Sequence, residues 1–147
     1  MRRRGPLPAR RVFVDTSAYF ALTDYADADH ATSQTLLQRL AVTRSHVFTS
    51  NLIVAETHAL LLSRLNAQIA RQFLDDLRQS RTTTLVWITP SDFEHAYEII
   101  ATYDDKDFSL TDATSFVVME RLKITHAFTL DHHFTQYGLT VLTPDSF

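Results

Sequence analysis

Arg11-Val12-Phe13-Val14-Asp15 is a short run of bulky apolar residues that stops abruptly at an acidic side chain. A run of this kind, rich in β-branched residues, predicts a buried strand. Similar runs predict further strands at 46–49, 84–89, 127–130 and 139–142. Between them, apolar residues at helical spacing and capping residues predict helices over 30–42, 51–65, 67–79, 91–102 and 109–122.

Short apolar strands that alternate with helices indicate an α/β fold with a mainly parallel sheet covered by helices on both faces. Right-handed crossovers then place the carboxyl ends of all strands at one edge of the sheet. The length of 147 residues suits a single domain, which we expect over residues 11–147. Residues 1–10 carry a cluster of arginines and are expected to form a basic, flexible leader.

The composition restricts the possible functions. No apolar run is long enough for a signal peptide or a membrane span, so a cytoplasmic location without membrane contact is expected. The absence of cysteine excludes disulfides, thiolate metal sites and cysteine nucleophiles. The net charge of -3 does not itself indicate a nucleic-acid partner, although an acidic metal site can hide basic patches in the total.

Four acidic residues occupy positions that can meet at one edge of the predicted sheet. Asp15 and Asp131 each directly follow a predicted strand, and open α/β sheets bind ligands beyond the carboxyl ends of their strands. Asp112 lies in the first turn of its helix. Glu56 lies in the helix 51–65, which is apolar almost all round and is therefore expected to be deeply buried or shared with another subunit.

Each acid except Glu56 also has an ordinary structural explanation. Asp15 can cap the turn that follows it, Asp112 can complete a capping box, and Asp131 can form a turn. Glu56 is harder to explain, because a carboxylate among apolar neighbours costs free energy unless a positive charge meets it. Four neighbouring carboxylates would repel each other, and a bound Mg²⁺ or Mn²⁺ ion would remove that repulsion. Zinc is a poorer fit without cysteine or regularly spaced histidine.

Four sequence blocks, 12–18, 49–56, 108–113 and 129–134, together resemble the PIN-domain family, most closely the VapC-type ribonuclease toxins of toxin–antitoxin pairs. The resemblance implies a three-layer α/β/α sandwich with a five-stranded parallel sheet and Mg²⁺- or Mn²⁺-dependent cleavage of RNA. It places the catalytic and metal-binding acids at Asp15, Glu56, Asp112 and Asp131. Four small polar positions of the family match less specifically, and they fall on Thr16, Ser17, Thr111 and Thr129.

The resemblance also implies a homodimer and a cognate antitoxin protein. Two other hypotheses stay open: a non-catalytic module that binds RNA or protein through the acids, and, more weakly, phosphoryl transfer through Asp15. Among the remaining residues, Lys106, Arg121 and Lys123 are candidates for RNA contact, but solvated helix ends are the simpler explanation. His30, His132 and His133 are candidates for phosphate contact or acid catalysis, but ordinary surface positions are the simpler explanation, and Trp87 is expected in the core.

Overall fold

The computed structural model of the protein describes residues 10–147, and its centre is a five-stranded sheet in the order β3-β2-β1-β4-β5. All neighbouring strands are parallel, with Val12 of β1 opposite Val47 of β2 and His126 of β4. The strands are β1 (Arg11–Val14), β2 (His46–Ser50), β3 (Thr83–Val86), β4 (His126–Phe128) and β5 (Thr140–Val141). The predicted parallel sheet is therefore confirmed.

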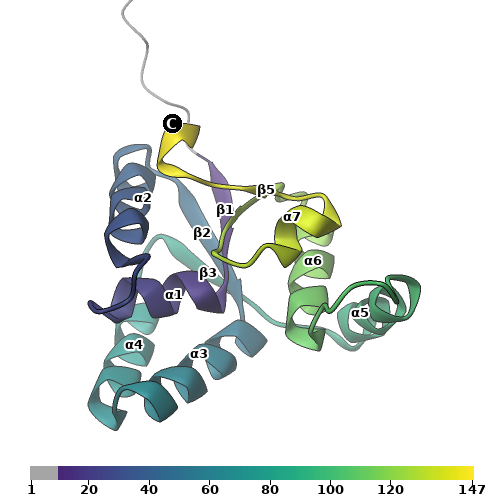
Figure 1. Ribbon diagram of the computed structural model, residues 1–147, viewed down its shortest axis with the longest axis horizontal. Helices are drawn as coiled ribbons and strands as arrows, with labels where there is room; N and C mark the ends of the chain where they lie inside the picture. The colour runs from purple at the N-terminus through teal and green to yellow at the C-terminus, as the bar shows by residue number, and fades with distance from the viewer. Residues whose placement is uncertain (1–9) are drawn as a thin grey trace, which may run out of the picture.

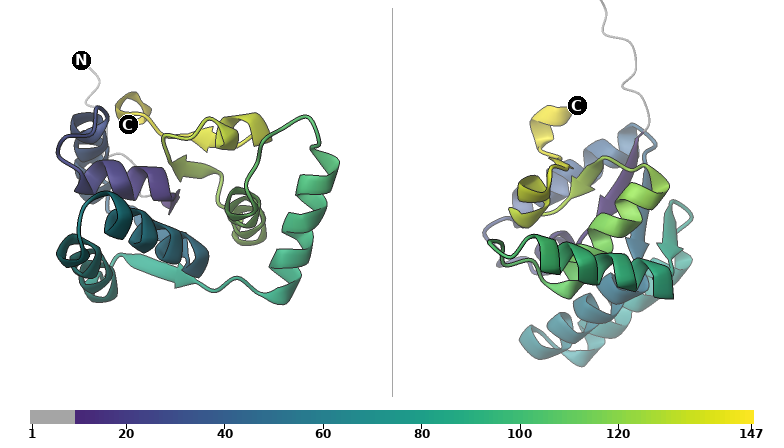
Figure 2. Two further views of the ribbon diagram at one scale, coloured as in Figure 1. Left: turned by 60° about the horizontal axis from the view of Figure 1, so that its bottom comes forward. Right: turned by 90° about the vertical axis from the view of Figure 1, so that its right-hand side faces the viewer.

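Helices cover both faces of the sheet, as Figures 1 and 2 show. The first layer holds α1 to α4, and the second holds α5 to α7, with α5 standing farthest from the sheet. The helices are α1 (Thr16–Thr23), α2 (His30–Val42), α3 (Asn51–Arg64), α4 (Ala67–Gln79), α5 (Pro90–Thr102), α6 (Leu110–Leu122) and α7 (His133–Tyr137), followed by the 3₁₀ turn η1 (Pro144–Ser146). This is the three-layer α/β/α sandwich that the sequence predicted.

Alternate side chains of β1 pack into two different hydrophobic clusters, one on each face of the sheet. Val12 and Val14 pack with the cluster that includes Leu36 of α2, whereas Phe13 packs with Phe116 of α6 and Phe134 of α7. All six side chains are almost fully buried. Alternate side chains of a strand point to opposite faces, so a strand buried on both sides has to be apolar throughout.

Several boundaries differ from the prediction for identifiable reasons. The helix α1, which directly follows Asp15, has no apolar stripe and was not predicted. The strand β3 ends at Val86, and α5 begins earlier than expected because Pro90 occupies its first position. Its capping box consists of Thr89 and Asp92, not Ser91 and Glu94. Proline suits a first helical position, where its missing N–H has no partner to lose.

Two burial predictions are wrong. Trp87 lies beyond the end of the edge strand β3 and is 68% exposed. The helix α3 is not buried all round: its buried stripe is Ile53, Thr57 and Leu61, and Leu62 is half exposed. Its packing on α1 and α4 therefore covers one face. The alternative for α3, contact with another subunit, stays a prediction.

The predicted leader falls almost entirely on residues 1–9, which lie outside the described part of the chain. Arg10, its last residue, contacts the body of the protein. Its guanidinium donates a 2.8 Å hydrogen bond to the Ser146 carbonyl and lies over the Phe147 ring, 5.0 Å from the centroid. Within residues 10–147, none of the helices combines the length and apolar character that spanning a bilayer demands.

Candidate active site

Asp15 lies at the carboxyl end of β1, where its buried side chain is held by one residue of α1 and one residue just beyond β4. One of its carboxylate oxygens, Oδ2, accepts hydrogen bonds from the Thr129 hydroxyl at 2.8 Å and the Ser17 hydroxyl at 3.0 Å. Asp15 occupies the N-cap position of α1, yet its side chain makes no capping hydrogen bond. The ordinary explanation of this residue as a helix cap therefore fails.

Burial raises the pKa of the Asp15 carboxyl to about 6. The hydrogen bonds from Thr129 and Ser17 act in the opposite direction, and the negative charge of Asp112 raises the pKa slightly further. A carboxylate removed from water is costly when ionised, so the site favours a proton or a cation at this position. The contribution of Asp112 also means that the two carboxyl groups feel each other.

Asp112 has a structural role and a place in the acidic site at the same time. It lies in the first turn of α6, where it forms a capping box with Ser109: the Asp112 N–H donates to the Ser109 hydroxyl, and the Ser109 N–H donates to Asp112 Oδ2. The same Oδ2 atom is 2.9 Å from Nδ1 of His133. The capping box fixes the carboxylate in place without using its second oxygen.

His133 joins Asp112 to Asp131. Its Nδ1 lies 2.9 Å from the Asp112 carboxylate and 3.2 Å from Oδ1 of Asp131, whose Oδ1 also accepts a 2.9 Å hydrogen bond from the His133 backbone N–H. The edge of the imidazole packs against Phe108, with 5.6 Å between ring centroids. His133 is therefore not the ordinary surface histidine that the sequence predicted, because only folding brings the two acids to its ring.

Asp131 follows β4 less directly than expected, because the strand ends at Phe128 and Thr129 and Leu130 intervene. The Thr129 hydroxyl accepts the Asp131 N–H at 3.0 Å while it donates to Asp15, so one hydroxyl connects two acids. Ser17 strengthens this link, with its hydroxyl 3.2 Å from that of Thr129 and accepting the Leu130 N–H. The structure thus brings Asp15, Asp112 and Asp131 together.

Glu56 differs from the other three acids. Its side chain is exposed on α3, and within residues 10–147 it makes no hydrogen bond or ion pair. The argument that apolar neighbours bury its charge is wrong, because Ile53 and Thr57 face the core and Glu56 faces away from it. Its membership of the site stays a prediction.

Of the four small polar residues predicted for the site, two donate side-chain hydrogen bonds to Asp15 and two do not. Ser17 and Thr129 form the network around Asp15. The Thr16 hydroxyl is buried and has no hydrogen-bond partner among the described residues. The Thr111 carbonyl accepts from Thr114 and Ser115, but the structure gives the Thr111 hydroxyl no hydrogen bond within residues 10–147.

The donor set fits a hard divalent cation. Asp112, Asp131 and His133 each offer a ligand atom, and these atoms lie within 4.8 Å of one another. Asp15 is not part of that group, but its buried carboxylate lies close enough for the charge of Asp112 to raise its pKa. The hydroxyl of the next residue, Thr16, has no hydrogen-bond partner among residues 10–147. Carboxylate and hydroxyl oxygens are the ligands that Mg²⁺ and Mn²⁺ favour.

Two other residues singled out in the sequence have structural partners. Arg121 is not free to contact RNA with its whole guanidinium group, because Asp92 binds it through two hydrogen bonds of 2.9 and 2.8 Å. His30 places Nδ1 2.7 Å from the Ala21 carbonyl, which ties α2 to α1.

The sequence and the structure both resemble known nucleases. The curated relative VapC20 of Mycobacterium tuberculosis, named a 23S rRNA-specific endonuclease, is 33% identical over 134 residues, which cover 91% of this chain and 99% of that protein. The crystal structure of VapC20, described as a sarcin-ricin loop cleaving toxin, matches with a TM-score of 0.83 over 90% of this chain and 99% of the other. The sequence resemblance to VapC-type toxins is thereby confirmed.

More distant structures share the fold alone. VapBC2 from Rickettsia felis, bound to a DNA fragment from its promoter, matches at 10% identity with a TM-score of 0.69 over 90% of this chain and 97% of the other. FitAcB from Neisseria gonorrhoeae matches at 15% identity with a TM-score of 0.66 over 92% and 99%. The PIN domain family model matches residues 12–139, so this chain belongs to the PIN domain family.

Proposed function

We propose that this protein is a metal-dependent endoribonuclease that hydrolyses RNA phosphodiester bonds at Asp15, Asp112 and Asp131. The observation that carries the proposal is that three acids from separate parts of the chain come together, with His133 contacting Asp112 and Asp131 and the Thr129 hydroxyl joining Asp15 to the Asp131 backbone. A relative that is 33% identical over nearly its whole length is named an endonuclease, which supports the same activity.

The cofactor in this proposal is Mg²⁺ or Mn²⁺, held by Asp15, Asp112 and Asp131 with Thr16 nearby. Such a cation, when bound, neutralises charge on the phosphate and favours ionisation of the attacking water. The protein supplies the geometry. Thr129 and Ser17 orient the Asp15 carboxylate and favour its ionised form, against the effect of burial.

His133 and Glu56 have different proposed roles. His133 is a positioning residue in this proposal, because its Nδ1 contacts the carboxylates of both Asp112 and Asp131. Glu56 is exposed and makes no bond to the other acids, so we propose that it orients water or completes the site once RNA is bound. Attack by water makes the 2′-hydroxyl unnecessary, and the products carry 5′-phosphate and 3′-hydroxyl ends.

The proposed substrate is a folded RNA. The relative VapC20 is named for 23S rRNA and for cleavage of the sarcin-ricin loop, so ribosomal RNA is the first substrate to test. VapC20 is also described as a toxin, and we extend this to the present chain: a toxin silenced by a cognate antitoxin protein, acting in the cytoplasm.

A homodimer belongs to the same proposal. Three aromatic side chains just before and on α5 are exposed: Trp87 by 68%, Phe93 by 44% and Tyr97 by 68%. Aromatic residues are enriched where protein chains contact each other. Light scattering of the protein, with and without Trp87→Ser and Tyr97→Ser, tests whether these residues hold two copies together.

The proposed activity is tested with purified protein and a ribosomal RNA fragment in the presence of Mn²⁺ or Mg²⁺. Asp15→Asn and Asp112→Asn should each abolish cleavage, whereas Asp75→Asn, an exposed aspartate on α4, should leave it unchanged. If Asp15→Asn still cleaves RNA, the catalytic hypothesis fails, and a module that only binds RNA or protein becomes the better account.

A further inference from the structure

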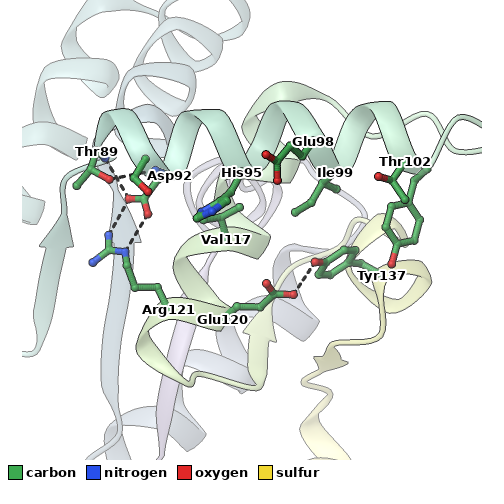
Figure 3. Close-up of a pocket in the computed structure, with 12 residues that line it drawn as sticks. Thr89, Asp92, His95, Glu98, Ile99, Thr102, Val117, Glu120, Arg121 and Tyr137 are labelled. Atoms are coloured by element: carbon green, nitrogen blue, oxygen red, sulfur yellow. Dashed lines mark hydrogen bonds and ion pairs between the residues drawn. The ribbon is translucent and has the colours of Figure 1, made fainter.

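A cavity of about 600 Å³ lies between α5 and α6, away from the three acids of the candidate active site. Figure 3 shows α5 along one wall and α6 along the other, with Tyr137 of α7 at one end. Asp15, Asp112 and Asp131 are not among the residues that line it. Its volume lies within the range of pockets that hold a drug-sized ligand or several side-chain groups.

One end of the cavity already holds a guanidinium group against a carboxylate. Asp92 is 2% exposed, and both of its oxygens accept hydrogen bonds from Arg121. Burial alone would raise the pKa of the Asp92 carboxyl, but the hydrogen bonds from Arg121 and Thr89 and the charge of Arg121 hold it below its usual value. This pair is neutral as a unit.

The middle of the cavity is left with a negative charge. Glu98 of α5 and Glu120 of α6 both line it, and neither forms an ion pair within residues 10–147. The Tyr137 hydroxyl donates a 2.5 Å hydrogen bond to Oε1 of Glu120, which fixes the carboxylate and leaves Oε2 available. Tyr137 is itself held by a stacked contact with Phe116, 4.4 Å between centroids. Tyr137 thus holds the Glu120 carboxylate at the wall of the cavity, and neither glutamate is bound to a cationic side chain among residues 10–147.

The surrounding lobe has the same sign of charge. Residues 90–107, which leave out the active-site residue Asp112, contain six acidic and one basic side chain, although the whole chain carries only a net charge of -3. A lobe this acidic repels the phosphate backbone of RNA and attracts a positively charged protein surface.

The remaining lining suits a long cationic side chain. Val117 and Ile99 provide apolar surface for methylene groups, and the rings of Tyr103 and Tyr137 provide aromatic surface for a cation. A planar guanidinium can bind a carboxylate with two parallel hydrogen bonds, which a compact ammonium cannot do. Asp92 and Arg121 show that geometry within the same cavity.

We propose that this cavity binds an arginine side chain presented by a protein partner, with Glu98 and Glu120 as the acceptors. The proposal concerns recognition of a partner and goes beyond the proposed nuclease function. Its test does not depend on RNA cleavage. A failure of the arginine-binding proposal is therefore distinguishable from a failure of the proposed nuclease function.

The probe is the capped tripeptide acetyl-Ala-Arg-Ala-amide, titrated into the isotope-labelled full-length protein and followed by NMR. The matched peptide contains citrulline, which keeps the shape of arginine without its charge. We expect saturable shifts at the backbone amides of Glu98, Thr102 and Glu120 with the arginine peptide, and affinity weaker by about tenfold or more with citrulline. Glu98→Gln combined with Glu120→Gln should remove the shifts, and Glu94→Gln, on α5 but outside the lining, should keep them.

Several results would overturn the proposal. Equal binding of the two peptides would show that charge is not recognised, and retention of the shifts in the double variant would place the site elsewhere. Tighter binding of guanosine monophosphate would make the cavity a nucleobase site, and tighter binding of spermidine would make it a site for small polyamines. Glu98→Gln alone, at an exposed residue without a bonded partner, provides the decisive comparison if the double variant does not fold.

Discussion

Nδ1 of His133 lies 2.9 Å from the carboxylate of Asp112, at the point where the first turn of α6 meets the first residue of α7. The same nitrogen is 3.2 Å from Asp131, so one imidazole sets the separation of two acids. Groups that orient the ligands of a metal usually contribute strongly to its affinity. The contact therefore gives His133 a role in metal binding that can be measured apart from catalysis.

Replacing His133 with glutamine should weaken Mn²⁺ binding by about 10-fold or more, because the Gln amide reaches the position of Nε2 and not that of Nδ1. Asparagine places its amide nitrogen close to the Nδ1 position, so His133→Asn should restore most of the affinity. Calorimetry with Mn²⁺ measures the affinities of the two purified variants. His95→Asn is the control, since His95 is an exposed histidine on α5 that makes no contact with the three acids. Equal affinities for His133→Gln and His133→Asn would contradict the role.

Replacing Thr129 with valine should impair the site through Asp15. The lost 2.8 Å hydrogen bond is one that lowers the pKa of Asp15, so this pKa should rise further. The Asp131 N–H also loses its acceptor, and we expect a stability loss of about 1–3 kcal/mol. Mn²⁺ calorimetry and urea unfolding measure the two effects. Thr129→Ser keeps the hydroxyl and should keep the Mn²⁺ affinity and the stability of the unsubstituted protein. If the Ser variant loses as much of both as the Val variant, the shape of the Thr129 side chain matters and its hydrogen bonds do not.

The stability of the metal-free protein should fall as the pH rises from about 4 to 6. Asp15 has a pKa of about 6 in the folded chain against an ordinary value of 3.8, so in that window the folded state binds more protons than the unfolded state. Stability must then decrease with increasing pH, by on the order of 2–3 kcal/mol in total. Urea unfolding in the presence of a chelator should show this slope. Asp15→Asn should remove it and be the more stable protein at neutral pH, whereas parallel pH profiles for the two proteins would refute the assignment.

The ion pair between Asp92 and Arg121 should stabilise the lobe formed by α5 and α6. Arg121→Gln leaves the buried Asp92 carboxylate without its cation, and we expect a loss of about 2 kcal/mol, less than for a fully buried pair because the Arg121 side chain is 41% exposed. The pKa of Asp92 is lowered by folding, so the stabilisation exists above its ordinary pKa and is lost as the pH falls through the folded value. A double-mutant cycle with Asp92→Asn measures the coupling, and a coupling near zero would contradict the prediction.

The sequence predicted the sheet and the position of three acids because both follow from local patterns. Asp15 and Asp131 follow apolar runs, and parallel strands bring their carboxyl ends to one edge. Glu56 shows the limit of this reasoning. Counting apolar neighbours along the chain does not give the direction of a helical side chain, and the buried stripe of α3 runs through Thr57 instead.

His133 and Thr129 show what local patterns cannot contain. The contact between His133 and Asp112 depends on the packing of α7 against α6. The hydrogen bond from Thr129 to Asp15 depends on the pairing of β4 with β1. The lobe of α5 was also unpredictable in detail, because Thr89 and Pro90 start the helix before the expected cap at Ser91.

The most direct test of the central claim is a cleavage assay on a ribosomal RNA fragment with analysis of the product ends. With Mg²⁺ or Mn²⁺ the protein should produce 5′-phosphate and 3′-hydroxyl ends, and both a chelator and Asp112→Asn should stop the reaction. Cleavage that persists in the chelator, or products that end in a cyclic phosphate, would contradict a metal-dependent hydrolysis at these carboxylates.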